Sequence, residues 1–447
     1  MSGDRTAHPP AMSPADLEKR EAGLIRALGI PGLTANIINT TIGAGIFALP
    51  AAVALQLGAA APLAFVICAV AMGLFVTCFA LAGSRVSVTG GLYAYVEVAF
   101  GRYIGFITAV LLFLSAVLSV AGVVTLFAGS VAALIPALNG TIGRAILMGV
   151  IYAVLAAINI RGVRAGSRTV AVVTVVKLVP LLVFILVGLF FIQPSALAWP
   201  GWPKGDTLGA TVLLLMFAFV GIEVALVPSG EVKNPSRTVP RAIFMALIVT
   251  TLIYISIQVV AQGILASDLG NHPTTPLAEA ARRFLGDGGR TLLLAGATIS
   301  AFGFVSSDIL GSPRYLFALG RDGILPKPFA HLHSKFRSPD VAILTYSATA
   351  FVLSLTSKFE KLAVMANVAV LVAYLVCSAA AWELIRRDVR SDGAPLMFPG
   401  ARVVPGFAIA AAIWILIHAT GDEFKVTAIA AGVASALYLV RRALARR

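Results

Sequence analysis

The chain alternates long runs of apolar residues with short polar connections. Twelve runs are bounded by charged residues, glycine or proline. Crossing a hydrocarbon core of about 30 Å takes about 20 apolar residues in a helix, and most of the runs reach that length. Continuous runs predict helices rather than the alternating strands of a membrane barrel. The predicted spans lie at 30–52, 60–83, 103–135, 142–160, 169–192, 208–229, 239–265, 291–318, 341–356, 361–385, 404–419 and 426–441.

Composition agrees with a membrane protein. The 447 residues are 59% hydrophobic and 12% charged, with a mean hydropathy of +0.94, whereas soluble domains carry about 25% charged residues. The net charge is +14. Most Lys and Arg residues fall on one side of the predicted topology, which predicts that both termini are cytoplasmic. This bias explains the basic charge without a nucleic-acid partner, and we expect a multi-pass protein of the plasma (inner) membrane, embedded in lipid.

The remaining chemistry points away from an enzyme. The three cysteines lie inside apolar runs, so neither a disulfide framework nor a disulfide-linked subunit is expected. Apart from His331 and His333, no two histidines have metal-ligand spacing, and no nucleophile-plus-base arrangement is visible, so we predict no catalytic residue, metal or cofactor. A channel is disfavoured because the chain shows neither repeated pore elements nor charged rings. Residues 1–26 are polar and are expected to form a cytoplasmic tail.

The first predicted span contains Thr40, Thr41, Ile42, Gly43, Ala44, Gly45, Ile46 and Phe47 near its middle. Two glycines that flank an alanine permit the helix to unwind, which frees backbone N–H groups at the start of its second half. Free amides at a helix N-terminus suit a carboxylate. The alternative is close packing against a neighbouring helix, since small residues are common at membrane interfaces.

A second candidate break lies midway along the sixth span, from Phe217 to Glu223. An acid at this depth is costly unless it faces water or a partner, so Glu223 is a functional candidate. The two breaks each begin a block of five helices, and the blocks enter the membrane from opposite sides. Such spacing is typical of inverted repeats, whose substrate binds where the two broken helices meet.

These motifs together resemble the amino acid–polyamine–organocation superfamily of transporters. The resemblance extends from about residue 27 to 441 and rests on residues 43–47, 217–223, 230–235, 239–241, 313–315 and 320–326. It implies an all-α polytopic fold of twelve transmembrane helices, with a leucine-transporter-like five-plus-five inverted repeat. The implied units are the first repeat at 27–192, the second at 205–390, helices 11 and 12 at 402–441, and a cytoplasmic end at 442–447.

The resemblance also implies a substrate site. Amides around Gly43, Ala44 and Gly45 would hold the carboxylate of an amino acid. Carbonyl groups near Thr41, Ile42, Phe217 and Val220 would accept hydrogen bonds from its ammonium group. In addition, Phe217 would form an aromatic gate, and Gly221 would leave room for the substrate side chain.

Lys177 lies in the fifth span, about 13 Å from its cytoplasmic end. Some relatives that resemble this chain place a lysine ammonium where sodium-dependent members hold a cation. We therefore expect sodium-independent transport, with Lys177 as a fixed or titratable cation. Snorkelling of the side chain to the membrane surface is the alternative.

The sequence does not decide the roles of two carboxylates. Asp308 could pair with Lys177, accept a cationic substrate group in the pocket, or pair with Arg314 or water. Glu223 matches an acid linked to proton sensing in related exchangers, or it braces the unwound backbone.

The predicted function is secondary active transport of amino acids by alternating access, as proton-coupled symport or as exchange. An antiporter of cationic amino acids or polyamines is the alternative within the same fold. Phe217 and Phe219 favour neutral or aromatic substrates, whereas Asp308 and Glu223 suit cationic ones.

Overall fold

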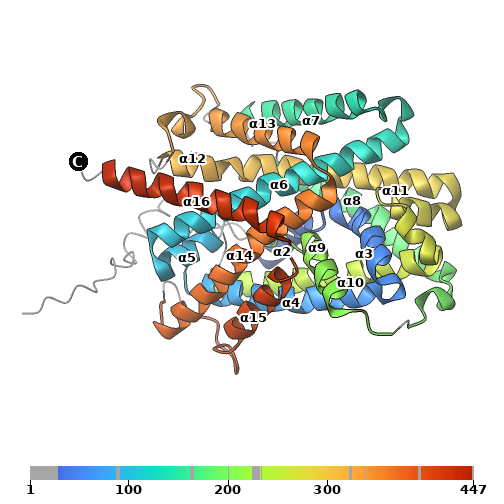
Figure 1. Cartoon of the computed structure of the whole chain (residues 1–447), viewed down its shortest axis with the longest axis horizontal. Helices are drawn as coiled ribbons and strands as arrows, with labels where there is room; N and C mark the ends of the chain where they lie inside the picture. The colour runs from blue at the N-terminus through green and yellow to red at the C-terminus, as the bar shows by residue number, and fades with distance from the viewer. Residues whose placement is uncertain are drawn as a thin grey trace, which may run out of the picture.

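The computed structural model describes residues 29–86, 91–161, 166–199, 201–223, 232, 234–321, 325–336, 338–390 and 394–444. Every element assigned in these ranges is an α-helix or a short 3₁₀ helix. The helices pack lengthwise beside one another (Figure 1). The predicted tail at 1–26, residues 230, 231 and 233 of one motif and residues 322–324 of another lie outside the described residues.

The described residues of the first half of the chain form seven α-helices, of which the first two are separated by the 3₁₀ turn η1 (Gly45–Phe47). They are α2 (Ile30–Thr41), α3 (Leu49–Leu57), α4 (Ala61–Gly83), α5 (Leu92–Phe100), α6 (Arg102–Leu134), α7 (Thr141–Arg161) and α8 (Gly166–Gly188).

The second half begins with a short helix that runs into the 3₁₀ turn η6 (Met216–Ala218). Its α-helices are α9 (Gly205–Leu215), α10 (Pro235–Leu265), α11 (Pro276–Gly311), α12 (Pro313–Arg321), α13 (Asp340–Thr356), α14 (Phe359–Arg386), α15 (Val404–Leu416) and α16 (Gly421–Leu444). The most extensive packing joins α14 to α6, and α16 lies against both (Figure 1).

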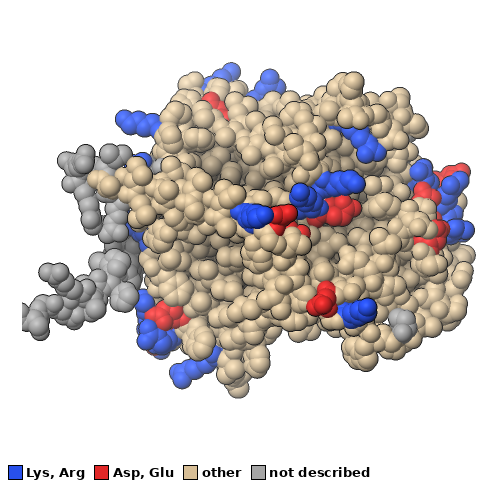
Figure 2. All heavy atoms as spheres, viewed as in Figure 1, with Lys and Arg blue, Asp and Glu red and all other residues tan. Residues whose placement is uncertain are grey.

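Seven segments in the described ranges are long and apolar enough to cross a membrane. Four shorter apolar helices accompany them, at Val176–Phe191, Gly205–Ala218, Asp340–Thr356 and Val404–Leu416. Large apolar side chains such as Phe190 and Leu186 are exposed, and Figure 2 shows charged side chains in small separate groups on a mostly uncharged face. A lipid environment accounts for such a surface, so the chain is a polytopic membrane protein.

A short helix that was not predicted precedes the span expected at 291–318. Helix α11 begins at Pro276, has a kink at Gly286, where φ is +63°, and ends at Gly311. The charges of Arg282, Arg283 and Arg290 made this segment look like a loop. In the structure, proline occupies the first helical turn and Arg290 pairs with Glu279 at 2.8 Å, which stabilises a helix outside the apolar run.

Candidate functional site

The first break separates α2 from α3. The last α-helical hydrogen bond of α2 joins the Ile42 amide to Ile38 O at 2.9 Å. The Gly43 amide then turns back to Thr41 O at 2.8 Å, and regular bonding resumes with the Phe47 amide and Ala44 O at 3.0 Å. The helical ladder is interrupted over residues 43 and 44, which confirms the predicted unwinding.

The second break follows α9 and η6. Bonding continues as far as the Val220 amide, which donates to Met216 O at 3.1 Å, and Gly221 then adopts a φ of +115°. Only glycine adopts such a backbone readily. A Cβ atom on Gly221 would lie 2.7 Å from Thr40 O, so the absent side chain lets the two breaks touch. The space that Gly221 leaves is therefore filled by the Thr40 carbonyl rather than kept open for a substrate side chain.

Lys177 binds the carbonyl end of α2. Its ammonium donates to Asn39 O at 2.6 Å and to Ile42 O at 2.7 Å, and the side chain is fully buried. These carbonyls lie at the negative end of the α2 dipole, where a cation is favoured. The Ser300 hydroxyl of α11 adds a weak contact to Ile42 O at 3.5 Å. Lys177 does not snorkel, because its head group is bonded inside the bundle.

Tyr254 connects the two breaks, and the sequence prediction missed it. Its hydroxyl, on α10, lies 2.9 Å from Thr41 O in the first break and 2.8 Å from Ala218 O in the second. A hydroxyl has one hydrogen to donate, so the two carbonyls share it. Phe219 packs edge-on against the ring at 5.3 Å and positions it.

Helix α14 supports the second break at two points. The Asn367 amide nitrogen donates to Leu213 O at 2.6 Å and to Leu214 O at 3.2 Å, at the carbonyl end of α9. Two turns further along, the Tyr374 hydroxyl donates to Glu223 Oε2 at 2.6 Å, and this oxygen also accepts from the Gly221 amide at 3.0 Å. Glu223 therefore has the geometry of a brace for the unwound segment.

Two aromatic rings border the first break. A Cβ atom on Gly45 would lie 3.1 Å from the Phe217 ring, and one on Gly43 would lie 3.5 Å from the ring of Phe304 on α11. Phe217 also meets Phe359 edge-on, with ring centroids 5.3 Å apart. The glycines thus bring backbone amides close to apolar walls. Phe304 was not predicted, since a phenylalanine in an apolar helix carries no distinguishing signal.

Asp308 is bonded away from both predicted cations. Its Oδ1 accepts from the Ser312 hydroxyl at 2.8 Å, and its Oδ2 contacts the Tyr346 hydroxyl of α13. No ion pair joins this described carboxylate to Lys177 or Arg314. The predicted pairs are wrong because Lys177 is engaged by backbone carbonyls and Arg314 is exposed.

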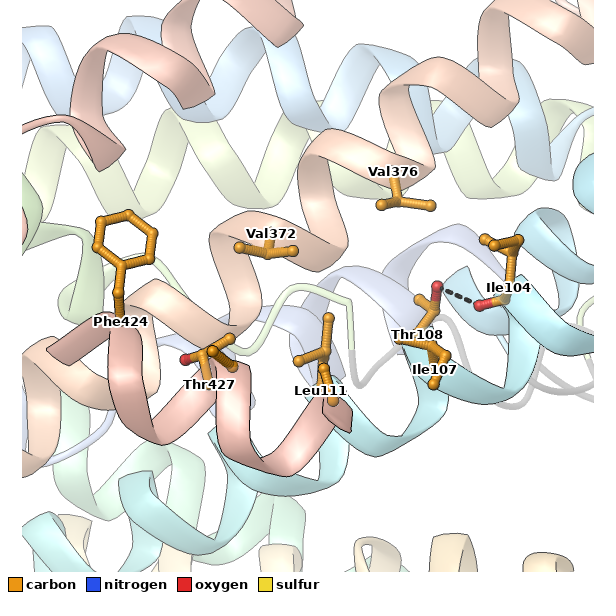
Figure 3. Close-up of a pocket in the computed structure, with 10 residues that line it drawn as sticks. Ile104, Ile107, Thr108, Leu111, Val372, Val376, Phe424 and Thr427 are labelled. Atoms are coloured by element: carbon orange, nitrogen blue, oxygen red, sulfur yellow. Dashed lines mark hydrogen bonds between the residues drawn. The ribbon is translucent and has the colours of Figure 1, made fainter. Parts of the chain in front are cut away.

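A separate apolar pocket lies between α6, α14 and α16, with a volume of about 340 Å³ (Figure 3). Aliphatic side chains and Phe424 form most of its wall. Its two hydroxyl groups belong to Thr108, which is bonded to Ile104 O at 2.9 Å, and to Thr427. This lining offers nothing to balance the charges of an amino acid, in contrast to the breaks.

A comparison with known protein families identifies the family of this chain. Residues 28–434 match a model described as amino acid permease. The chain belongs to this amino acid permease family. The family is part of the amino acid–polyamine–organocation superfamily, so the resemblance seen in the sequence is confirmed.

Similar proteins include exchangers and permeases. The serine/threonine exchanger SteT of Bacillus subtilis is 28% identical over 411 residues, which cover 89% of this chain and 90% of that protein. The branched-chain amino acid permease BcaP of the same organism is 26% identical over 426 residues and 89% of each chain. The vacuolar cationic amino acid transporter 2 of Arabidopsis thaliana is 27% identical over 83% of this chain and 61% of that protein. This permease family confirms the prediction of a transporter rather than an enzyme.

Proposed function

We propose that this permease carries amino acids across the membrane by alternating access, without sodium, as proton-coupled symport or as exchange. One observation carries the proposal. Two interrupted helices meet at Gly221 and Thr40, and the Tyr254 hydroxyl bridges them. At one point inside a membrane protein, freed backbone amides can bind a carboxylate and freed carbonyls can bind an ammonium group, the two charged groups that all amino acids share.

In this proposal, the substrate carboxylate lies against the amides of Ala44 and Gly45, and against the Gly43 amide once this amide has left Thr41 O. Its ammonium group donates to carbonyls of both breaks, near Thr41, Ile42, Phe217 and Val220. Thr41 O already accepts from Tyr254 and from the Gly43 amide, and Ile42 O accepts from Lys177 and weakly from Ser300. A carbonyl oxygen has two lone pairs, so the ammonium group takes the place of the Gly43 amide at Thr41 O and of the weak Ser300 contact at Ile42 O.

Lys177 supplies a positive charge within the protein where a bound metal cation would otherwise be needed. Its two short hydrogen bonds stabilise the end of α2 next to the substrate. Loss of its proton would remove the attraction for the α2 carbonyl end and free the helix to move. This chemistry supports coupling by a proton, or exchange with Lys177 as a fixed charge. Glu223, on the second break, is the other candidate for proton sensing.

The proposed topology has twelve spans, with a first repeat at 27–192, a second at 205–390 and two further helices at 402–441. Each break opens one repeat, and the fifth helix of that repeat supports it. Helix α8 supplies Lys177 to the first break, and α14 supplies Asn367 to the second. Termini on the cytoplasmic side of the plasma membrane agree with the distribution of Lys and Arg.

The preferred substrates in this proposal are amino acids with neutral side chains. Phe217 and Phe304 border the first break, while Glu223 and Asp308 are each occupied by hydroxyl or amide donors. A cationic side chain or polyamine therefore lacks a free carboxylate there. Transport of cationic amino acids is the second candidate, because Asp308 carries no described ion pair and could exchange its hydroxyl partners for a substrate.

The test is uptake by the purified protein in sodium-free proteoliposomes loaded with unlabelled amino acid. Labelled L-serine, L-leucine, L-arginine and putrescine are compared, with and without an inward proton gradient. We expect uptake of the neutral amino acids and little of the others. Preferential arginine or putrescine uptake would support the second candidate, and uptake that requires sodium would contradict the role given to Lys177.

A further inference from the structure

Asp308 is a buried acid that the proposed transport site does not use. The residue is 8% exposed, and its two oxygens contact the hydroxyls of Ser312 and Tyr346. Tyr346 is fully buried, and the ring of Phe113 on α6 meets it edge-on at 5.8 Å. The carboxyl group is therefore held in a closed environment between α11 and α13.

No described cation neutralises this carboxyl group. The side chains within electrostatic reach are tyrosines, which cannot balance a negative charge: Tyr346 on α13, Tyr152 on α7 and Tyr315 on α12. On α8, Lys177 is bonded to α2, and on α10 the Tyr254 hydroxyl is bonded to the two breaks. Of the arginines on α6, α7 and α12, none is ion-paired with Asp308 in the described chain.

An unpaired ionised carboxylate in a dry interior costs several kcal/mol, whereas a neutral carboxyl group needs only ordinary hydrogen bonds. The neutral form can donate its proton to one hydroxyl oxygen and accept a bond from the other hydroxyl. Ser312 and Tyr346 can serve in these two roles. The geometry therefore suits a carboxyl group that carries a proton while the site is closed.

The position of Asp308 connects this proton to the contact between α11 and α13. Ser312 lies between α11 and α12 with helical dihedral angles, and its amide donates to Asp308 O at 2.8 Å, so α11 continues almost without interruption into α12. The Asp308–Ser312 side-chain bond lies along this helix, and the Tyr346 contact joins it to α13. A negative charge on Asp308 would draw water into the contact and weaken the packing of α11 on α13.

We propose that Asp308 is a second proton-binding site of this transporter. An O–H bond of a hydronium ion in bulk water breaks, and an O–H bond forms on the carboxylate as α11 and α13 close around it. That bond breaks and the proton returns to water when the contact opens. This inference rests on the proposed transport function, and it differs from a pair with Lys177 or a direct contact with substrate.

The first test does not depend on transport. Infrared difference spectra between acid and alkaline pH are recorded for the wild type, Asp308→Asn and Glu223→Gln. We expect a protonated-carboxyl band that is absent only in Asp308→Asn, with Glu223→Gln as the matched control at the other buried acid. A spectrum of Asp308→Asn identical to that of the wild type would overturn the proposal. If that variant fails to fold, Tyr346→Phe replaces it, and an unshifted band in that variant would overturn the proposal equally.

The second test measures coupling in proteoliposomes, with the labelled neutral amino acid that the wild type exchanges fastest, because the proposed site for neutral substrates does not use Asp308. Asp308→Asn keeps both hydroxyl contacts, so we expect exchange at equal pH within threefold of the wild type. Stimulation by a proton gradient should fall at least tenfold. Full stimulation in Asp308→Asn, or none in an actively exchanging wild type, would contradict a coupled proton. A wild type without any exchange would instead contradict the proposed function, while the infrared result still judges Asp308.

Discussion

The two breaks are held by different chemistry. At the first, a buried ammonium from α8 binds the carbonyl end of α2 through Asn39 and Ile42. At the second, a neutral amide from α14 binds the carbonyl end of α9, and an acid braces the unwound turn through the Gly221 amide. At both ends, backbone carbonyl groups lack partners within their own helix and need other donors, yet only the first end receives a formal positive charge.

This difference predicts which break responds to charge. Asn367 cannot titrate, so its hydrogen bonds to α9 do not depend on pH. Lys177 can lose a proton, and its bonds to α2 would then weaken. The first break is thus the one whose support can be switched, while Tyr254 links its position to that of the second. Four substitutions test this difference between the two breaks.

The largest effect is expected from Lys177→Ala. Two hydrogen bonds from a charged donor are lost, each contributing roughly 1.5–3 kcal/mol. Amino acid exchange in proteoliposomes should fall about 100-fold or more. Lys335→Ala, which removes an exposed lysine, is the matched control and should behave as the wild type. If the exchange rate of Lys177→Ala equals that of this control, Lys177 has no role in transport.

Next in size is Gly221→Ala. The new Cβ atom would lie 2.7 Å from Thr40 O on a backbone with φ of +115°, and such strain costs on the order of 1–3 kcal/mol. The breaks would be forced apart, so exchange should fall by more than tenfold. Gly140→Ala, where nothing lies within 4 Å, should leave exchange unchanged. If both variants exchange alike, contact between the breaks is irrelevant to transport.

A smaller effect is expected from Tyr254→Phe, which removes only the bridging hydroxyl. The ring and its contact with Phe219 remain, and one neutral hydrogen bond contributes about 1 kcal/mol. Exchange should fall about fivefold, with the melting temperature nearly unchanged. The matched control is Tyr438→Phe on α16, which should exchange amino acids as the wild type does. A Tyr254→Phe variant with wild-type exchange would show that the two breaks move independently.

The smallest effect at fixed pH is expected from Glu223→Gln. The amide oxygen can still accept from Tyr374 and from the Gly221 amide, so the brace survives. Exchange should stay within threefold of the wild type, measured as a pH profile of initial rates. A flattened profile would support proton sensing by Glu223. An unchanged profile would reject sensing and leave the brace as its role.

Both breaks could be predicted because glycines and an acid inside apolar runs stand out against their surroundings. Residues 43–45 and Gly221 carry that signal in the chain itself. Lys177 stood out for the same reason, as a charge deep in a span. Its partners could not be predicted, because backbone carbonyls of a distant helix leave no mark in the sequence.

The residues that were missed are uncharged. Tyr254, Asn367 and Tyr374 lie in helices that are apolar around them, and their roles depend on which carbonyl or carboxylate tertiary packing brings near. The expected pairing of Asp308 with Lys177 failed for a related reason. Opposite charges at similar depth need not meet, since each can be satisfied by nearer uncharged groups.

The most direct test is a cryo-electron microscopy map of the protein in lipid nanodiscs with the best neutral substrate of the uptake panel. We predict substrate density between the two breaks, with the carboxylate of the substrate at the amides of Gly43 to Gly45 and its ammonium group toward the carbonyls around Phe217. Density for the amino acid elsewhere, such as in the pocket between α6, α14 and α16, with the breaks empty, would contradict this prediction.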